Sequence, residues 1–229
     1  MPLVNPVINR VFRRASHGIL SRGTGGRTYT NLFLQSINQN SASWSAAALT
    51  SRLRDAVAPD GVANTATTMV ETNTLSNHGV TQIPSPAVAA NQILTMSCWV
   101  KRGEGTRNFS LLLLGSGGAN FSRQFFNLTT GVVGTSQLVG NGIIINKGIK
   151  AFPNSWYRIW VTGKHSTTVA LGDTRFEMNE DETTSYTGDG TSSILIWGAQ
   201  LQTDAAPSNL IRTTTTRLTQ EETENIYGN

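Results

Sequence analysis

The stretch Ile194-Leu-Ile-Trp-Gly-Ala-Gln-Leu201 carries the most direct indication of the fold of this chain. Its side chains alternate along the sequence in the way that a β-strand requires. The residues expected to share one face are Leu195, Trp197, Ala199 and Leu201. Gly198 follows Trp197, and its missing side chain lets the indole or a neighbouring strand pack closely. We therefore predict a strand over these residues and assign Trp197 to packing.

Two further runs repeat this alternation. Ile93–Lys101 has an apolar residue at every second position, but Trp99 falls on the opposite, mostly polar face. Trp156–Thr162 alternates in the same way, and Trp160 again lies among polar residues. The remaining strand-like runs are Ser45–Val57, Thr65–Thr72, Asn108–Leu114, Arg123–Leu128, Gly142–Asn146 and Thr167–Leu171.

Glycine-rich turns such as Gly115–Gly118 separate these runs, and little helical periodicity is present. Ser45–Val57 is the exception, because Leu49, Leu53 and Val57 fit a helical stripe as well as one face of a strand. Many short strands with turns between them predict an all-β protein with a jelly-roll β-sandwich.

The composition agrees with a folded domain. Of the 229 residues, 38% are hydrophobic and only 14% are charged, whereas a disordered chain needs a high charge density to stay expanded. The single cysteine, Cys98, excludes an intrachain disulfide. No apolar stretch approaches the roughly 20 residues that a membrane span needs, and Arg13 and Arg14 interrupt the apolar residues that a secretory signal would require. We therefore expect no membrane contact.

Charge divides the chain into three zones. We expect a basic, extended N-terminal arm over residues 1–30, a sandwich over residues 31–212 and a short polar C-terminal tail over residues 213–229. The arm contains no acidic residue, and its basic residues are Arg10, Arg13, Arg14, Arg22 and Arg27. Phe12 and several aliphatic residues lie between them and need an apolar groove on a partner.

Four segments appear in a fixed order. They are Asn31-Leu-Phe-Leu-Gln-Ser36 with Trp44, the turn Ala58-Pro-Asp-Gly61, the run Leu94–Lys101, and Trp156-Tyr-Arg158 with Ile194–Leu201 and Pro207-Ser-Asn-Leu-Ile211. This order resembles a carbohydrate-binding-like jelly-roll module of bacteriophage structural and tail proteins. The first segment resembles the opening strand of the module. The resemblance covers residues 31–212 and favours a strand over Ser45–Val57, whereas Gln202 stands where the module often has glutamate.

The resemblance implies a non-enzymatic structural component of a virion, assembled in the cytoplasm of the host bacterium. Such a protein would be an exterior decoration, a fibre or a tail adaptor, and a homo-oligomer such as a trimer. We expect the arm to dock on a neighbouring capsid, tail or fibre protein through Arg10, Phe12, Arg13, Arg14, Arg22 and Arg27. Nucleic acid is a less favoured partner because the arm is short, lacks interleaved aromatic residues, and the net charge is only +4.

The alternative function is a module that binds a host-surface polysaccharide or receptor. Sugar sites need exposed aromatic faces beside polar groups, and Trp99 and Trp160 are the candidate contact residues because their strand faces are polar. Trp156 and Trp197 are assigned to packing, since both lie in the motifs that define the fold.

We expect no enzyme, cofactor or metal site. The histidines His17, His78 and His165 are scattered, and no catalytic motif surrounds them. The acidic residues Glu177, Glu180, Asp181 and Glu182 have the chemistry of a glycosidase pair or of calcium ligands. A glycosidase holds its carboxylates on rigid strands across a cleft, so we interpret this cluster as a solvated loop between strands.

Overall fold

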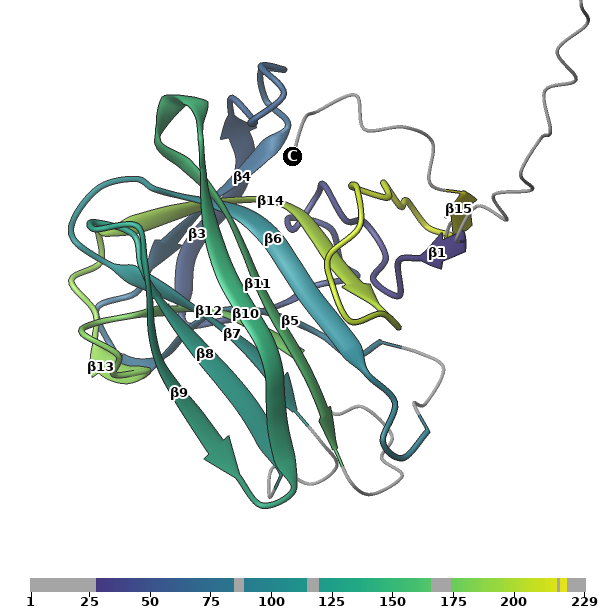
Figure 1. The fold of residues 1–229 in the computed structure, drawn as a ribbon. Helices are drawn as coiled ribbons and strands as arrows, with labels where there is room; N and C mark the ends of the chain where they lie inside the picture. The colour runs from purple at the N-terminus through teal and green to yellow at the C-terminus, as the bar shows by residue number, and fades with distance from the viewer. Residues whose placement is uncertain (1–27, 85–88, 115–119, 166–173, 218, 222–229) are drawn as a thin grey trace, which may run out of the picture.

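The computed structural model describes residues 28–84, 89–114, 120–165, 174–217 and 219–221, and it consists of two antiparallel β-sheets packed face to face (Figure 1). This architecture confirms the predicted all-β jelly-roll sandwich. Within the described residues, no helix is long and apolar enough to cross a membrane.

The first sheet has six strands in the order β10-β11-β6-β14-β4-β3. The strands are β3 (Leu49–Ala56), β4 (Ala66–Glu71), β6 (Leu94–Arg102), β10 (Gly142–Phe152), β11 (Trp156–His165) and β14 (Ser193–Gln202). A short 3-10 turn, Pro153–Ser155, connects β10 to β11.

The second sheet has seven strands. Six follow the order β13-β5-β12-β7-β8-β9, and the seventh, β2, also pairs with β5. The strands are β2 (Ser45–Ala47), β5 (Leu75–Gln82), β7 (Asn108–Leu114), β8 (Phe121–Asn127), β9 (Val132–Val139), β12 (Thr174–Asn179) and β13 (Ser185–Thr187). A separate two-stranded sheet joins β1 (Thr28–Thr30) to β15 (Thr219–Glu221).

Most predicted strands are confirmed. Ser45–Val57 is extended, as the resemblance implied, and it divides into β2 and β3 at Ala48, whose φ is 45°. The expected opening strand at Asn31–Ser36 is wrong, since these residues form turns. The predicted strand Thr167–Leu171 and turn Gly115–Gly118 lie outside the described residues.

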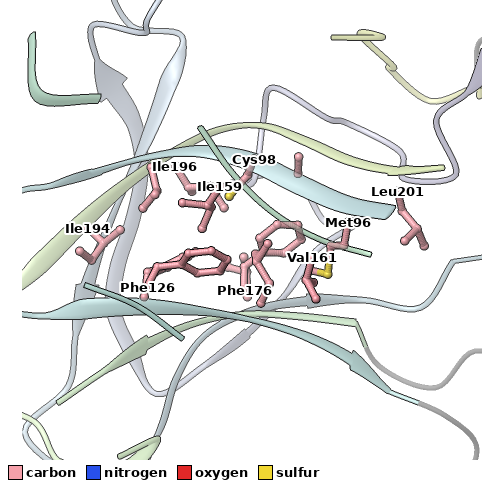
Figure 2. Packing of buried hydrophobic residues seen from close by; sticks show 14 of the residues in the cluster. Met96, Cys98, Phe126, Ile159, Val161, Phe176, Ile194, Ile196 and Leu201 are labelled. Atoms are coloured by element: carbon pink, nitrogen blue, oxygen red, sulfur yellow. The ribbon is translucent and has the colours of Figure 1, made fainter. Parts of the chain in front are cut away.

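The main core fills the space between the inner faces of the two sheets. Figure 2 shows residues of the six-stranded sheet facing two phenylalanines of the other, Phe126 and Phe176. The residues of the six-stranded sheet labelled there are Met96, Cys98, Ile159, Val161, Ile194, Ile196 and Leu201. Cys98 is completely buried, as predicted for a small apolar side chain, and this burial raises the pKa of its thiol.

A β-bulge in β14 corrects the predicted face of Ile194–Leu201. Trp197 pairs with Trp99, but the next paired residue is Gln200, opposite Ser97, so one extra residue enters the strand. Gly198 takes φ +65° at this point. The alternation therefore changes phase, and Trp197 lies on the outer face while Ala199 lies in the main core.

The outer face of the six-stranded sheet carries a second hydrophobic cluster. Trp99, Trp156 and Trp197 are 7%, 1% and 5% exposed, and Leu210 packs against them. The rings of Trp99 and Trp197 meet edge to face, with their centroids 5.3 Å apart. This burial confirms that Trp156 and Trp197 are packing residues, although they pack outside the sandwich interior.

The chain after β14 crosses this outer face and closes the second cluster. The hydroxyl of Thr95 donates to the carbonyl of Asp204 over 2.6 Å, and the amide of Ile211 donates to Oε1 of Gln200 over 2.8 Å. Gln200 Nε2 also donates to the Ser208 hydroxyl over 2.9 Å. The outer face of β6 and β14 is therefore covered by this segment, which explains why polar Thr95 is fully buried.

Asn31, near the start of the described chain, is hydrogen-bonded to the residues of β14 that follow the bulge. Its Nδ2 donates to the carbonyls of Ala199 and Ile211, over 3.1 and 3.0 Å. Its Oδ1 accepts from the amides of Phe33 and Leu201, both over 3.1 Å. A turn residue near the start of the domain therefore holds its last strand in place.

Replacing Gly198 with alanine should test how strictly the bulge needs glycine. An added Cβ would lie 2.8 Å from a ring carbon of Trp99, at a backbone φ that favours glycine. We expect a loss of about 2–4 kcal/mol in the free energy of unfolding. Gly61→Ala is the matched control, because Gly61 has φ +81° but no atom within 4 Å of its Cβ position, and should cost only about 1 kcal/mol. Equal losses for both variants in urea unfolding would show that the close approach of Trp99 is unimportant.

Candidate functional site

Glu177 lies at the centre of a polar network on the outer face of the seven-stranded sheet. It is 2% exposed and belongs to β12, between β5 and β7. Its Oε2 accepts from Nη2 of Arg123 on β8 over 3.0 Å, and its Oε1 accepts from Nδ2 of Asn77 on β5 over 3.0 Å. Nη1 of Arg175 lies 3.6 Å from the same Oε1. The carboxylate is thus neutralised by two arginines and engaged at both oxygens.

The acidic residues that follow Glu177 in the sequence are hydrogen-bonded to other parts of the chain. Glu180 accepts from Nη1 of Arg107 over 2.7 Å, and Glu182 accepts from the amide and hydroxyl of Thr135 on β9, over 2.7 and 2.6 Å. The prediction of one solvated acidic loop is therefore wrong for Glu177, which is buried on a strand. The described residues contain no group of three or more side chains arranged to hold a metal ion.

A second buried ion pair joins the two sheets at one end of the sandwich. Glu71, at the end of β4, is completely buried, and Arg107 donates to it through Nε at 3.1 and 3.0 Å and through Nη2 at 2.8 Å. The hydroxyl of Tyr186 on β13 donates to Oε2 of Glu71 over 2.6 Å, and the amide of Asp189 donates to Oε1 over 2.8 Å. The pKa of Arg107 is raised, chiefly by its hydrogen bonds to Glu71.

Tyr186 is held as a neutral donor in this network. Its pKa is raised well above the ordinary value, first by burial and then by the hydrogen bond to Glu71. The Arg107 guanidinium lies 4.7 Å from the Tyr186 ring centroid, and His78 packs on the same ring with centroids 4.7 Å apart. Glu71, Arg107 and Tyr186 all have hydrogen-bond partners within this network, so it has the character of a structural link. Nothing in the sequence pattern identified it.

Trp99, one of the two predicted contact residues, does not present an exposed ring. Trp197 and Phe152 contact it edge to face, and the Arg158 guanidinium lies 4.4 Å from its ring centroid. Burial lowers the pKa of Arg158 to about 10, so it keeps its charge at neutral pH while it donates to the Ser208 carbonyl. Trp99 is therefore a packing residue, because the returning chain covers a strand face that is polar in sequence.

Trp160, the other predicted contact residue, is partly exposed. It lies on the outer face of β11, opposite Gly148 of the edge strand β10. A Cβ at Gly148 would be 2.0 Å from Cζ2 of Trp160, so the indole lies directly against the backbone of β10. Asn146 and Lys150, two positions away on either side of Gly148, share this face and are exposed. The arrangement offers an aromatic ring beside an amide and an ammonium group.

The contact residues predicted for the docking arm, from Arg10 to Arg27, lie outside the described residues, whereas the last three residues of the arm, Thr28–Thr30, form β1. The first and last described strands nevertheless pair, with Thr28 opposite Glu221 and Thr30 opposite Thr219. The two ends of the described chain therefore meet at one place, beside the returning segment after β14 (Figure 1).

Comparison with known proteins found no matching family model and no matching curated protein. Solved structures with similarity include the CBM22-1 and GH10 modules of the Clostridium thermocellum endo-1,4-β-D-xylanase 10B complexed with xylohexaose. The identity is 13% and the TM-score 0.41, over 78% of this chain and 28% of that chain. The enzymatically active domain of tailspike protein 4 from bacteriophage CBA120 is similar at 10% identity and TM-score 0.42, over 75% of this chain and 21% of that chain.

A third similar structure is the CBM22-1 xylan-binding domain of Paenibacillus barcinonensis Xyn10C. It has 14% identity and a TM-score of 0.40, over 79% of this chain and 97% of that chain. The chain thus spans under a third of the first two structures and nearly all of the third.

Removal of either arginine around Glu177 should separate a structural ion pair from a surface one. Arg123→Ala leaves the buried carboxylate without its closest charged partner and should destabilise the protein by about 3–5 kcal/mol. Arg175→Ala is the control, because that side chain is 36% exposed and 3.6 Å from Glu177, and it should cost about 1 kcal/mol or less. Urea denaturation of both variants measures the difference, and similar losses would contradict this assignment.

Proposed function

We propose that this chain is a non-enzymatic structural component of a bacteriophage particle, serving as an exterior decoration, a fibre or a tail adaptor. The pairing of β1 with β15 is the observation that carries the proposal. It brings residue 28 and residue 221 together, so the first and last described strands meet at one place. A compact domain whose first and last described strands lie side by side suits attachment to a larger assembly.

The charge of the first segment supports attachment to a protein. Residues 1–27 hold Arg10, Arg13, Arg14, Arg22 and Arg27 without any acid. The same segment contains apolar residues, including Phe12. Arginine pairs bidentately with carboxylates, and apolar side chains fill grooves, so an acidic groove on a neighbouring capsid, tail or fibre protein is the expected partner.

The state of the acidic residues supports a role without catalysis. A general acid or base needs a carboxyl group within reach of substrate and free to exchange a proton. Glu177 has both oxygens engaged by donors on other strands of the same sheet, and Glu180 pairs with Arg107. A glycosidase would need two such groups facing each other across a cleft. These residues instead serve to hold strands and loops together.

Deletion of residues 1–27 tests attachment directly. We expect the truncated protein to remain folded, with an unfolding midpoint within about 2 °C of the full chain, because both sheets and both hydrophobic clusters are built from residues after 27. We expect its incorporation into particles to fall at least about tenfold, as measured by quantitative immunoblotting of purified particles. Deletion of residues 222–229 is the control and should incorporate normally. Normal incorporation of the protein without residues 1–27 would exclude the arm as the attachment element.

Glycan binding is a second candidate function, favoured by the position of Trp160 on Gly148. One ring face rests on the backbone of β10, and the side chain is partly exposed between Asn146 and Lys150. A rigid indole with flanking hydrogen-bond donors is the chemistry that sugar rings require. Because β10 and β11 are paired over their full length, the ring would be held in place before a ligand arrives.

A host-surface polysaccharide binding assay with Trp160→Ala examines this candidate. We expect the full chain to bind and the variant to bind about five- to thirtyfold more weakly, because an aromatic platform contributes about 1–2 kcal/mol. Lys101→Ala is the control, since Lys101 lies on the same face of the sheet but beside Leu195 of β14. Absence of binding by the full chain, or equal binding by both variants, would count against a glycan site at Trp160.

A further inference from the structure

The free edges of the two large sheets differ in how they avoid pairing with other chains. Natural edge strands carry charged residues, prolines or irregularities, or are very short. At the edges, β2 and β13 have three residues each, and β3 contains Arg52, Arg54 and Asp55. β10 contains Lys147 and Lys150 and a shift of register. β9 also contains a shift of register, but it has eight residues, VVGTSQLV, with no charge and no proline.

The surface along β9 is apolar at both ends of the strand. Val132 is 54% exposed, and Leu138 and Val139 are 51% and 36% exposed. No charged residue occurs between Val132 and Lys147, so the turn into β10 continues the same surface. Lys147 itself donates to the Ser136 hydroxyl near the centre of the strand, over 2.7 Å. β9 pairs with β8 on one side, and among the described strands none pairs with its other side. A long, uncharged and partly apolar edge of this kind is a site for strand pairing.

The sequence of β9 has the same character in both directions. When the strand is paired antiparallel with a copy of itself about its centre, Val132 faces Val139 of the copy. Val133 then faces Leu138, the bulge residues Gly134 and Thr135 together oppose Gln137, and Ser136 faces Ser136 of the copy. Apolar residues therefore meet apolar residues at both ends, and small polar residues meet at the centre. This symmetry is what a two-fold interface between identical strands requires.

We propose that the β9 edge is a self-association surface, on which a second copy of this chain pairs antiparallel through its own β9. The two seven-stranded sheets would then join into one continuous sheet across a two-fold axis. This proposal does not depend on a role in a virion, because it follows from the strand edge alone.

The side chains of β9 lie on the faces of the sheet that this register requires, and the bulge in the strand is part of the reason. Val133 pairs with the core residue Phe126 and packs against the main core, so it lies on the inner face. Leu138 pairs with Ser122, four residues before Phe126 on β8, and thus lies on the same face. Val132 and Val139 lie on the outer face. Each proposed pair therefore joins side chains on the same side of the combined sheet.

The centre of β9 limits the strength of the pairing. The amide of Thr135 already donates to Glu182, and the carbonyls of Gly134 and Thr135 accept from Gln124 Nε2, each over 2.8 Å. Intermolecular hydrogen bonds would therefore form mainly at the two ends of the strand. An average protein interface has about ten hydrogen bonds, and this one would have roughly half, so we expect a dimer with a micromolar dissociation constant.

Sedimentation of the full chain between roughly 1 and 200 µM is the first test. We expect a concentration-dependent dimer that Leu138→Lys weakens at least about tenfold, because the variant would bury an unpaired ammonium group opposite Val133. Leu75→Lys is the matched control, since Leu75 is 72% exposed on β5, a strand distant in the sheet order from β9. It should leave the dissociation constant unchanged.

Cysteine cross-linking tests the register independently. Val132→Cys and Val139→Cys should each resist cross-linking alone but form a disulfide when the two proteins are mixed and oxidised, because these positions face each other only across the two-fold axis. The native Cys98 is completely buried and does not interfere. A full chain that stays monomeric at the highest concentration would overturn the proposal, as would an oligomer that Leu138→Lys leaves intact or a mixture that forms no disulfide.

Discussion

One extra residue in β14 decides which side chains enter each of the two hydrophobic clusters. Without the bulge at Gly198, regular alternation would send Gln200 into the main core and expose Ala199 to the outer face. With it, Gln200 reaches Ser208 and Ile211 on the outer face, while Ala199 and its neighbours complete the sandwich interior.

The segment after β14, which crosses the outer face, depends on this outward position of Gln200. The side chains of Gln200 and Asn31 supply hydrogen bonds to a segment that has no strand partner, and this segment covers Trp99. A buried segment without such partners would leave backbone groups unsatisfied at a cost of about 1–3 kcal/mol each. The outer cluster is thus covered because side chains such as that of Gln200 supply the hydrogen bonds that a paired strand would otherwise supply to this segment.

The charged residues of the interior connect elements that no strand pairing joins. Arg107 links β4 to the segments around Glu180 and Tyr186, and Arg123 links β8 to β12 through Glu177. Buried ion pairs contribute little net stability, but loss of one partner is costly, so such pairs act against alternative arrangements. The surfaces that we propose for partners are the edge strand β9, the ring of Trp160 and the paired strands β1 and β15.

The sequence alone determined the class of fold, the positions of most strands and the burial of Trp156 and Trp197, because alternation is a local property of the chain. It did not reveal the phase change at Gly198, which depends on the pairing of β14 with β6. It placed Trp99 on a polar face and Glu177 in a loop, since the covering segment and the arginine partners come from distant parts of the chain. The self-complementary order of β9 is readable in the sequence, but only the tertiary structure decided that this strand lies at an edge. Residues near one another in sequence share a period, whereas burial, charge pairing and edge position are set by contacts between strands far apart.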